Sequence, residues 1–214
     1  MAEDMKAAVS ALLKGIDRYN PNNVVMFEQY VDRQCQDNTY DLEANLALLK
    51  LYQFNPDSYN QEITQRILLK AITNLPHTDI ILCKCLLASE NMEKPEIRVI
   101  LRLSTLLELC QFQTFWEQIE DQQELISDIT GFEDSVRRYV CHVLNITYQR
   151  IGKELVQSAL NVSASELSAW VTKYGWSDEG ETIFIRNQDE SVKTKNIREK
   201  IDFETVAGLM ATSK

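Results

Sequence analysis

Glycine and histidine are scarce in this sequence, and their scarcity excludes several kinds of catalytic and binding site. The 214 residues include only six glycines, and none of them has the spacing of a phosphate-binding loop. The two histidines, His77 and His142, supply few general bases, and no nucleophile-elbow pattern is present. We therefore expect no catalytic residues, no cofactor and no enzymatic activity.

Cysteine occurs in an odd number, and its spacing fits neither a disulfide framework nor a metal site. Cys83 and Cys85 are two residues apart, and on a helix such side chains point about 200° away from each other, so both thiolates cannot ligate one ion. The adjacent Cys141 and His142 diverge in a similar way, which disfavours a nucleophile and base pair. We predict no metal site and five reduced, mostly buried thiols: Cys35, Cys83, Cys85, Cys110 and Cys141.

Long apolar runs are absent as well. No stretch approaches the roughly 18 apolar residues of a membrane span, and the first ten residues, MAEDMKAAVS, are too polar for a signal peptide. We therefore expect no membrane association and a cytoplasmic location, with the nucleus as a second compartment.

Negative charge dominates the first 130 residues. They hold 11 Lys and Arg against 20 Asp and Glu, a net charge of −9, whereas residues 131–214 hold 11 against 12, a net charge of −1. The frequency of glycine changes at the same place, because Gly15 is the only glycine before residue 131. We therefore predict two domains, 1–130 and 131–214. An acidic chain is also a poor candidate for wrapping nucleic acid, since that affinity comes mainly from Lys and Arg that neutralise phosphates.

The apolar residues of the first domain recur at helical spacing. Val24, Phe27, Val31 and Cys35, for example, would line one face of a helix. Helix pairs repeat about every 35 to 40 residues, which is typical of HEAT-like helical repeats that bury their apolar stripes by stacking. The helices are expected over residues 2–13, 21–35 (with Asn20 as cap and Pro21 in the first turn), 41–54, 59–73, 78–88, 95–109, 113–127 and 131–148.

The second domain combines two short helices with strands. Helices are expected over 151–160 and 163–174, and the second should begin with a capping box of Ser163 and Glu166 and end at Gly175. Alternation over Thr182–Arg186 predicts a strand with Ile183 and Ile185 on one face and Phe184 on the other. Residues 191–195 could return as its partner strand. This order predicts a winged-helix domain, so the expected fold class is mainly α, a helical-repeat domain followed by a winged helix.

Two surfaces of the second domain are candidates for partner binding. The strand could present an edge for strand addition, and an amphipathic C-terminal helix could pack into a helical bundle. The alternative is that both surfaces only close their own domain. A basic cluster near the wing is more readily explained as a solvated rim than as an RNA contact. The candidate interface residues are Thr182, Phe184, Arg186, Lys193, Lys195, Phe203, Val206, Leu209 and Met210.

Six blocks of sequence, spread over nearly the whole chain, carry a family resemblance. They are GIDRYNP (15–21), YDLEANLALLKLYQFNP (40–56), LPHTDIILCKC (75–85), ITGFEDSVRRYVCHV (129–143), KYGW (173–176) and KIDF (200–203). The chain resembles the PCI-module family, whose members are subunits of the proteasome lid, the COP9 signalosome and eukaryotic translation initiation factor 3. The blocks are most similar to the initiation-factor members.

The resemblance implies a non-catalytic scaffold subunit of the factor that binds the small ribosomal subunit. Its partners would be the other subunits of that factor, most directly subunit L through the winged-helix side, and the small ribosomal subunit through the complex. Two alternatives stay open. One is a PCI subunit of the proteasome lid or the COP9 signalosome. The other is a nucleic-acid-binding winged helix, although Lys173 is the only basic residue of its second helix, 163–174.

Overall fold

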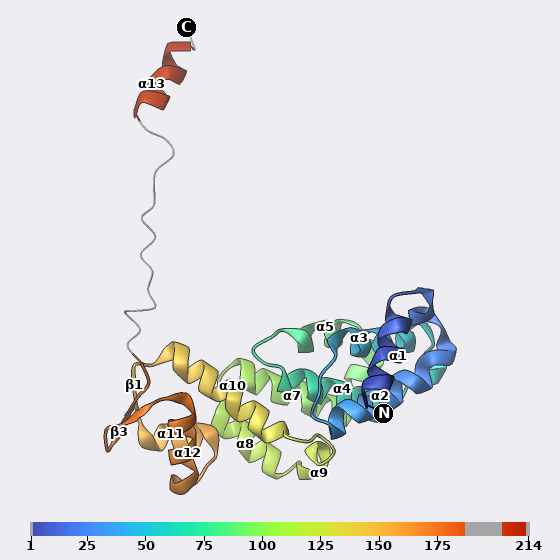
Figure 1. The fold of residues 1–214 in the computed structure, drawn as a ribbon, viewed down its shortest axis with the longest axis horizontal. Helices are drawn as coiled ribbons and strands as arrows, with labels where there is room; N and C mark the ends of the chain where they lie inside the picture. The colour runs from blue at the N-terminus through green and yellow to red at the C-terminus, as the bar shows by residue number, and fades with distance from the viewer. Residues whose placement is uncertain (1, 187–202, 213–214) are drawn as a thin grey trace.

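The chain folds into a mainly helical structure (Figure 1). The computed structural model describes residues 2–186 and 203–212. The α-helices are α1 (Ala2–Leu13), α2 (Val24–Gln36), α3 (Leu42–Phe54), α4 (Gln61–Thr73), α5 (Asp79–Cys85), α6 (Ser89–Met92), α7 (Pro95–Glu108), α8 (Phe112–Glu120), α9 (Gln123–Ile126), α10 (Phe132–Thr147), α11 (Lys153–Leu160), α12 (Ala164–Tyr174) and α13 (Phe203–Thr212). Short 3-10 helices are η1 (Ile16–Tyr19), η2 (Pro21–Asn23) and η3 (Pro56–Ser58), and the strands are β1 (Arg150–Gly152), β2 (Ser177–Asp178) and β3 (Thr182–Phe184).

Local side-chain caps explain where several helices begin. The Asp41 carboxylate accepts a hydrogen bond from the Ala44 amide at the start of α3, and the Asn60 side chain does the same for Glu62 and Ile63 in α4. Such caps satisfy amides that have no partner inside the helix. The expected capping box is confirmed at α12, where Ser163 and Glu166 hydrogen-bond reciprocally.

Two expected helices are shorter than predicted. The helix expected over 78–88 ends at Cys85, because the Leu86 amide turns back to the carbonyl of Cys83 and tightens the last turn. The helix expected over 113–127 is divided into α8 and α9 by a turn at 121–122, in which the Gln122 amide bonds to the carbonyl of Ile119. The other helices of this part begin and end within a few residues of their predicted limits.

The helices of the first part stack along the long axis of the molecule, with α1 at one end (Figure 1). Contacts run from α2 to α4, from α4 to α7 and from α4 to α10. The buried apolar side chains form one continuous cluster that extends from Val9 to Ile185. The predicted apolar face of α2 is buried in this cluster, as expected. Within the described residues, no helix is long and apolar enough to cross a membrane.

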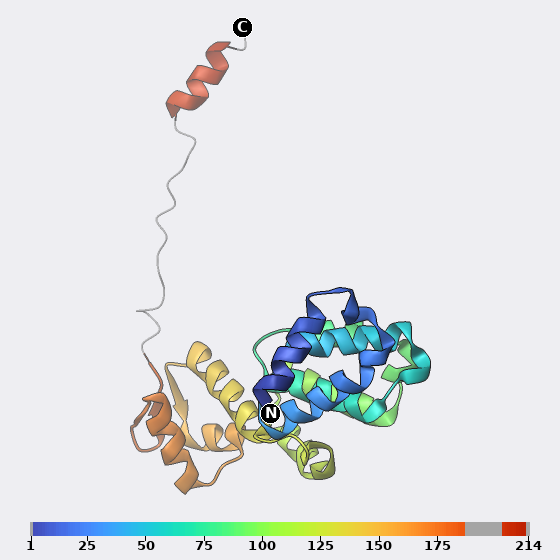
Figure 2. The same ribbon diagram turned by 45° about the vertical axis from the view of Figure 1, so that its right-hand side comes forward.

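Helix α10 joins the stacked helices to the C-terminal elements. Its N-terminus is held by the end of α2, because the Thr130 amide donates to the carbonyl of Cys35 at 3.1 Å. Arg66 of α4 adds two ion pairs at 2.7 Å, one with Asp32 of α2 and one with Asp128 just before α10. From this end α10 runs toward α11 and the sheet (Figure 2). The position of α10 is therefore fixed by two helices of the first part.

The three strands form an antiparallel sheet in the order β1-β3-β2. Ile183 and Ile185 are buried and Phe184 faces the other side, as predicted. Two strands were missed, however. Residues 150–152 form β1 instead of starting the helix expected over 151–160, since Ile151 pairs with Ile183 across the ladder. The strand expected over 191–195 lies outside the described residues, and β3 pairs instead with β2 on one side and β1 on the other.

Candidate partner-binding surfaces

The central position of β3 changes the expected mode of partner binding. Both neighbours of β3 are strands of the same chain, so Thr182–Phe184 has no open edge to offer. The prediction that this strand presents an edge for strand addition is therefore wrong. Among the described residues, the outer edges of the sheet belong to β1 and β2.

The outward face of β3 is partly covered by Arg150 of the neighbouring strand β1. Phe184 is half-buried, and the guanidinium carbon of Arg150 lies 5.2 Å from the centre of its ring. Arg150 also pairs with Glu179 at 3.0 Å, and Lys153 pairs with Asp178. Hydrogen bonds from Arg150 and Lys153 lower the pKa of the Glu179 and Asp178 carboxyls, respectively.

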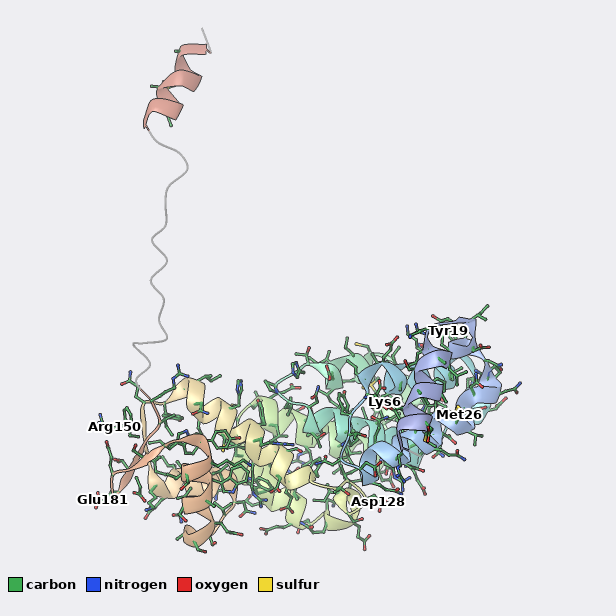
Figure 3. All side chains as sticks on the ribbon, viewed as in Figure 1. Lys6, Tyr19, Met26, Asp128, Arg150 and Glu181 are labelled. Atoms are coloured by element: carbon green, nitrogen blue, oxygen red, sulfur yellow. The ribbon has the colours of Figure 1, made fainter. Side chains whose placement is uncertain are left out.

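These two ion pairs join the hairpin formed by β2 and β3 (residues 177–184) to Arg150 of β1 and Lys153 of α11. Figure 3 shows Arg150 and Glu181 at this end of the molecule, opposite the end that carries Tyr19 and Met26. Because solvent screens exposed pairs of this kind, a partner could displace them at little cost. The apolar side of Phe184 would then become available for contact.

Helix α13 contains the four predicted tail residues. Val206 and Met210 are exposed, Met210 to 71%, and they lie four residues apart, which places them on one face of the helix. Phe203 and Leu209 belong to the same helix. Lys193 and Lys195, the two lysines among the candidate interface residues, lie outside the described residues.

Further exposed apolar side chains near the sheet were not predicted. Leu155 of α11 is 65% exposed, and it lines a cavity of about 380 Å³ with Cys110, Phe112 and Ala159. Ile146, at the end of α10, is 64% exposed. In the sequence each of these residues continues the apolar pattern of a helix, so only the three-dimensional packing shows that it faces outward.

The aromatic side chains of α12 pack against one another instead of facing a groove. The Trp170 and Tyr174 rings stack with their centres 6.1 Å apart, and Tyr174 contacts Trp176 in turn at 5.4 Å. The ammonium of Lys173 lies 4.4 Å from the centre of the Trp170 ring. The one basic residue of α12 is thus already engaged within the chain, which does not favour base readout by this helix.

The thiols do not form a reactive group or a metal site among the described residues. Cys83 is buried and Cys85 is exposed, so the two point to different sides of α5, as their spacing predicted. Burial raises the pKa of Cys35 to about 11 and the pKa values of Cys83 and Cys141 to about 12. No group of three or more His, Cys, Asp or Glu side chains in the described ranges could hold a metal ion.

Comparison with known proteins gives the family of the chain. The model of the CSN8/PSMD8/EIF3K family matches residues 58–196. The chain is 55% identical to eukaryotic translation initiation factor 3 subunit K of Homo sapiens, over 100% of this chain and 99% of that protein. Identity to the proteins of the same name is 54% in Danio rerio, over 99% of this chain and 98% of the relative, and 52% in Bombyx mori, over 99% and 97%. Since the family model covers more than half of the chain and the relatives match over almost their full length, the chain belongs to the CSN8/PSMD8/EIF3K family.

Proposed function

We propose that this chain is a non-catalytic scaffold subunit of eukaryotic translation initiation factor 3. The observation that carries the proposal is the 52–55% identity, over nearly the full length, to relatives that bear the name of subunit K of this factor. In this role the chain holds other subunits in place, so that the assembled factor can act on the small ribosomal subunit in the cytoplasm. The nucleus is a second proposed location.

The proposed architecture is a HEAT-like helical-repeat domain over 1–130 and a winged helix over 131–214. The order α10, β1, α11, α12, β2, β3 and the sheet order β1-β3-β2 support the winged helix. A winged helix places its sheet beside a three-helix core, which leaves one face of the sheet free for other molecules. In this chain that face carries Phe184 and Arg150, which pairs with Glu179.

The proposed contact surface for the other subunits, most directly subunit L, lies on the C-terminal elements. It comprises the outward face of the hairpin at Phe184 and Arg186 and the exposed face of α13 at Val206 and Met210. Apolar side chains this exposed cost solvation free energy, which burial against a partner would recover at about 25 cal/mol per Å². Leu155 is a further candidate for this surface.

Affinity capture of the tagged full chain from cytosol, followed by mass spectrometry, tests the proposal. After nuclease treatment and a wash of rising salt, we expect recovery of initiation-factor subunits, with subunit L retained longest. Recovery of proteasome-lid or signalosome subunits, or of nuclease-sensitive partners alone, would overturn it.

The interface is tested by Met210→Asp in the same capture. This variant should keep the helical content of the chain, because the side chain is 71% exposed, but it should reduce the recovery of subunit L. Ser10→Asp, at an exposed position of α1, is the matched control and should not change recovery. Equal recovery with both variants would remove α13 from the proposed interface.

A further inference from the structure

A cavity of about 630 Å³ lies on the first part of the chain, away from the sheet. It is bordered by the end of α5, the connection between α6 and α7, and α7, which lie near the middle of the long axis in Figure 1. Apolar side chains supply much of the wall, and they are Met92, Pro95, Val99 and Leu101. Ile81, one turn before Lys84 on α5, is 50% exposed and can extend this apolar wall.

The rim of this cavity has the opposite charge to the rest of the first 130 residues. Lys84, Arg98 and Arg102 line it together with one carboxylate, Glu93. The first 130 residues carry a net charge of −9 and only 11 Lys and Arg, yet three of those 11 surround this one cavity. All three side chains are exposed, and no ion pair joins any of them to a carboxylate within the described residues.

The arrangement of the two arginines costs the isolated chain free energy. Arg98 and Arg102 are four residues apart on α7, so their like charges face each other across one turn and destabilise the helix slightly. With the Gln118 amide turned to present its oxygen, Arg102 donates to that oxygen from Nη2 at 3.0 Å and from Nε at 3.1 Å. This contact holds the guanidinium in place without neutralising it. A carboxylate bound between the arginines would remove their repulsion.

We propose that this cavity binds an acidic, amphipathic segment of a partner protein, with an apolar side chain in the cavity and flanking carboxylates on Lys84, Arg98 and Arg102. A protein segment fits better than a nucleic acid for two reasons. The wall offers apolar contacts that a phosphate backbone cannot use, and the net charge of −9 over the first 130 residues repels a long polyanion. The site is separate from the C-terminal surface of the proposed function, so either can fail without the other.

Fluorescence anisotropy with the full chain tests this inference. The probes are a short labelled peptide with Leu and Phe at helical spacing and Glu elsewhere, the same peptide with Lys in place of every Glu, and a short single-stranded RNA. We expect the Glu peptide to bind in the micromolar range and to weaken as salt is added. Absence of binding by the Glu peptide, equal binding by the Lys peptide, or tighter binding by the RNA would overturn the proposal.

Charge-reversal variants test whether the peptide binds at the cavity. Arg98→Glu combined with Arg102→Glu should weaken the affinity for the Glu peptide by roughly tenfold or more. The control, Lys6→Glu combined with Lys14→Glu, makes the same change in net charge at two exposed lysines on or next to α1 and should have less than about a twofold effect. Lys84→Glu is a third variant, which tests the rim from α5 if the double arginine variant does not fold. Equal weakening by the control would contradict a local site.

Discussion

Gly131 is the position where a single methyl group should disturb the junction between the two parts of the chain. It precedes α10 with φ of 71°, in the left-handed region that side chains disfavour. A Cβ atom at this position would lie 2.7 Å from Nδ2 of Asn38, which is closer than a Cβ atom approaches a nonbonded neighbour. Gly175, at φ of 68°, has the same backbone conformation but no atom within 4 Å of such a Cβ. Comparing Gly131→Ala with Gly175→Ala therefore separates the steric contact from the backbone strain.

The two substitutions should differ by about 1 to 3 kcal/mol. Alanine in the left-handed region costs roughly 1 to 2 kcal/mol, and the loss of glycine's freedom in the unfolded chain returns about 0.4 to 1 kcal/mol. Gly175→Ala should thus lower the free energy of unfolding by about 1 kcal/mol. At Gly131 the Asn38 amide must also move, although its oxygen is the 3.5 Å partner of the buried Lys70 ammonium. Disturbing a hydrogen bond to a buried charged group adds about 1 to 3 kcal/mol.

Urea unfolding followed by circular dichroism measures both free energies. A double variant, Gly131→Ala with Asn38→Gly, removes the clashing amide and suits the left-handed backbone of residue 38, at φ of 50°. It should show a coupling of about 1 kcal/mol between the two sites, because the three atoms nearest to the added methyl group, all in the Asn38 side chain, are then removed. If Gly131→Ala costs no more than Gly175→Ala, the contact with Asn38 does not constrain the junction and this reasoning is refuted.

Three further predictions concern the sheet, the cap of α12 and the thiols. Ile183→Asp should abolish the native circular dichroism spectrum because it buries a charge, whereas Phe184→Asp should keep the fold and reduce partner capture. The pKa of Glu166 is lowered by hydrogen bonds from the backbone and side chain of Ser163, so Ser163→Ala should raise it, and a nuclear magnetic resonance titration would show the change. In the native chain, the stabilisation from this cap is present above the unfolded-state pKa of Glu166 and is lost as the pH falls through the folded-state pKa. Titration with a thiol reagent at mildly alkaline pH should modify two thiols quickly and all five only after unfolding. The two exposed thiols are Cys85 and Cys110, and the three buried ones are Cys35, Cys83 and Cys141.

Features set by neighbouring residues could be predicted from the sequence. The cap of α12 depends on Ser163 and Glu166, which are three residues apart, and its end depends on the left-handed backbone of Gly175. The alternation of Ile183, Phe184 and Ile185 likewise gave the correct faces of β3. In each case the interaction that fixes the structure acts within about one helical turn or along one strand, so its pattern is visible in a short stretch of sequence.

Features set by distant residues could not be predicted in this way. Strand β1 has only three residues, and it is extended because it pairs with β3, which lies 30 to 34 positions later in the sequence. Nothing in the sequence Arg150–Gly152 distinguishes it from the first turn of a helix. The position of β3 between β1 and β2 is also a property of the assembled sheet, and it reversed the expectation of an open edge at Thr182.

The same reasoning explains why the basic cavity was not visible in the sequence. Lys84 belongs to α5, whereas Arg98 and Arg102 belong to α7, and the acidic residues around them in the sequence hide their common location. The cavity and the C-terminal surface lie on different elements, joined by the single continuous core that runs through α4 and α10. A packed core of this kind transmits a binding event only if it has a second stable arrangement. We therefore expect the two surfaces to be occupied independently, which suits a subunit that holds two partners at once.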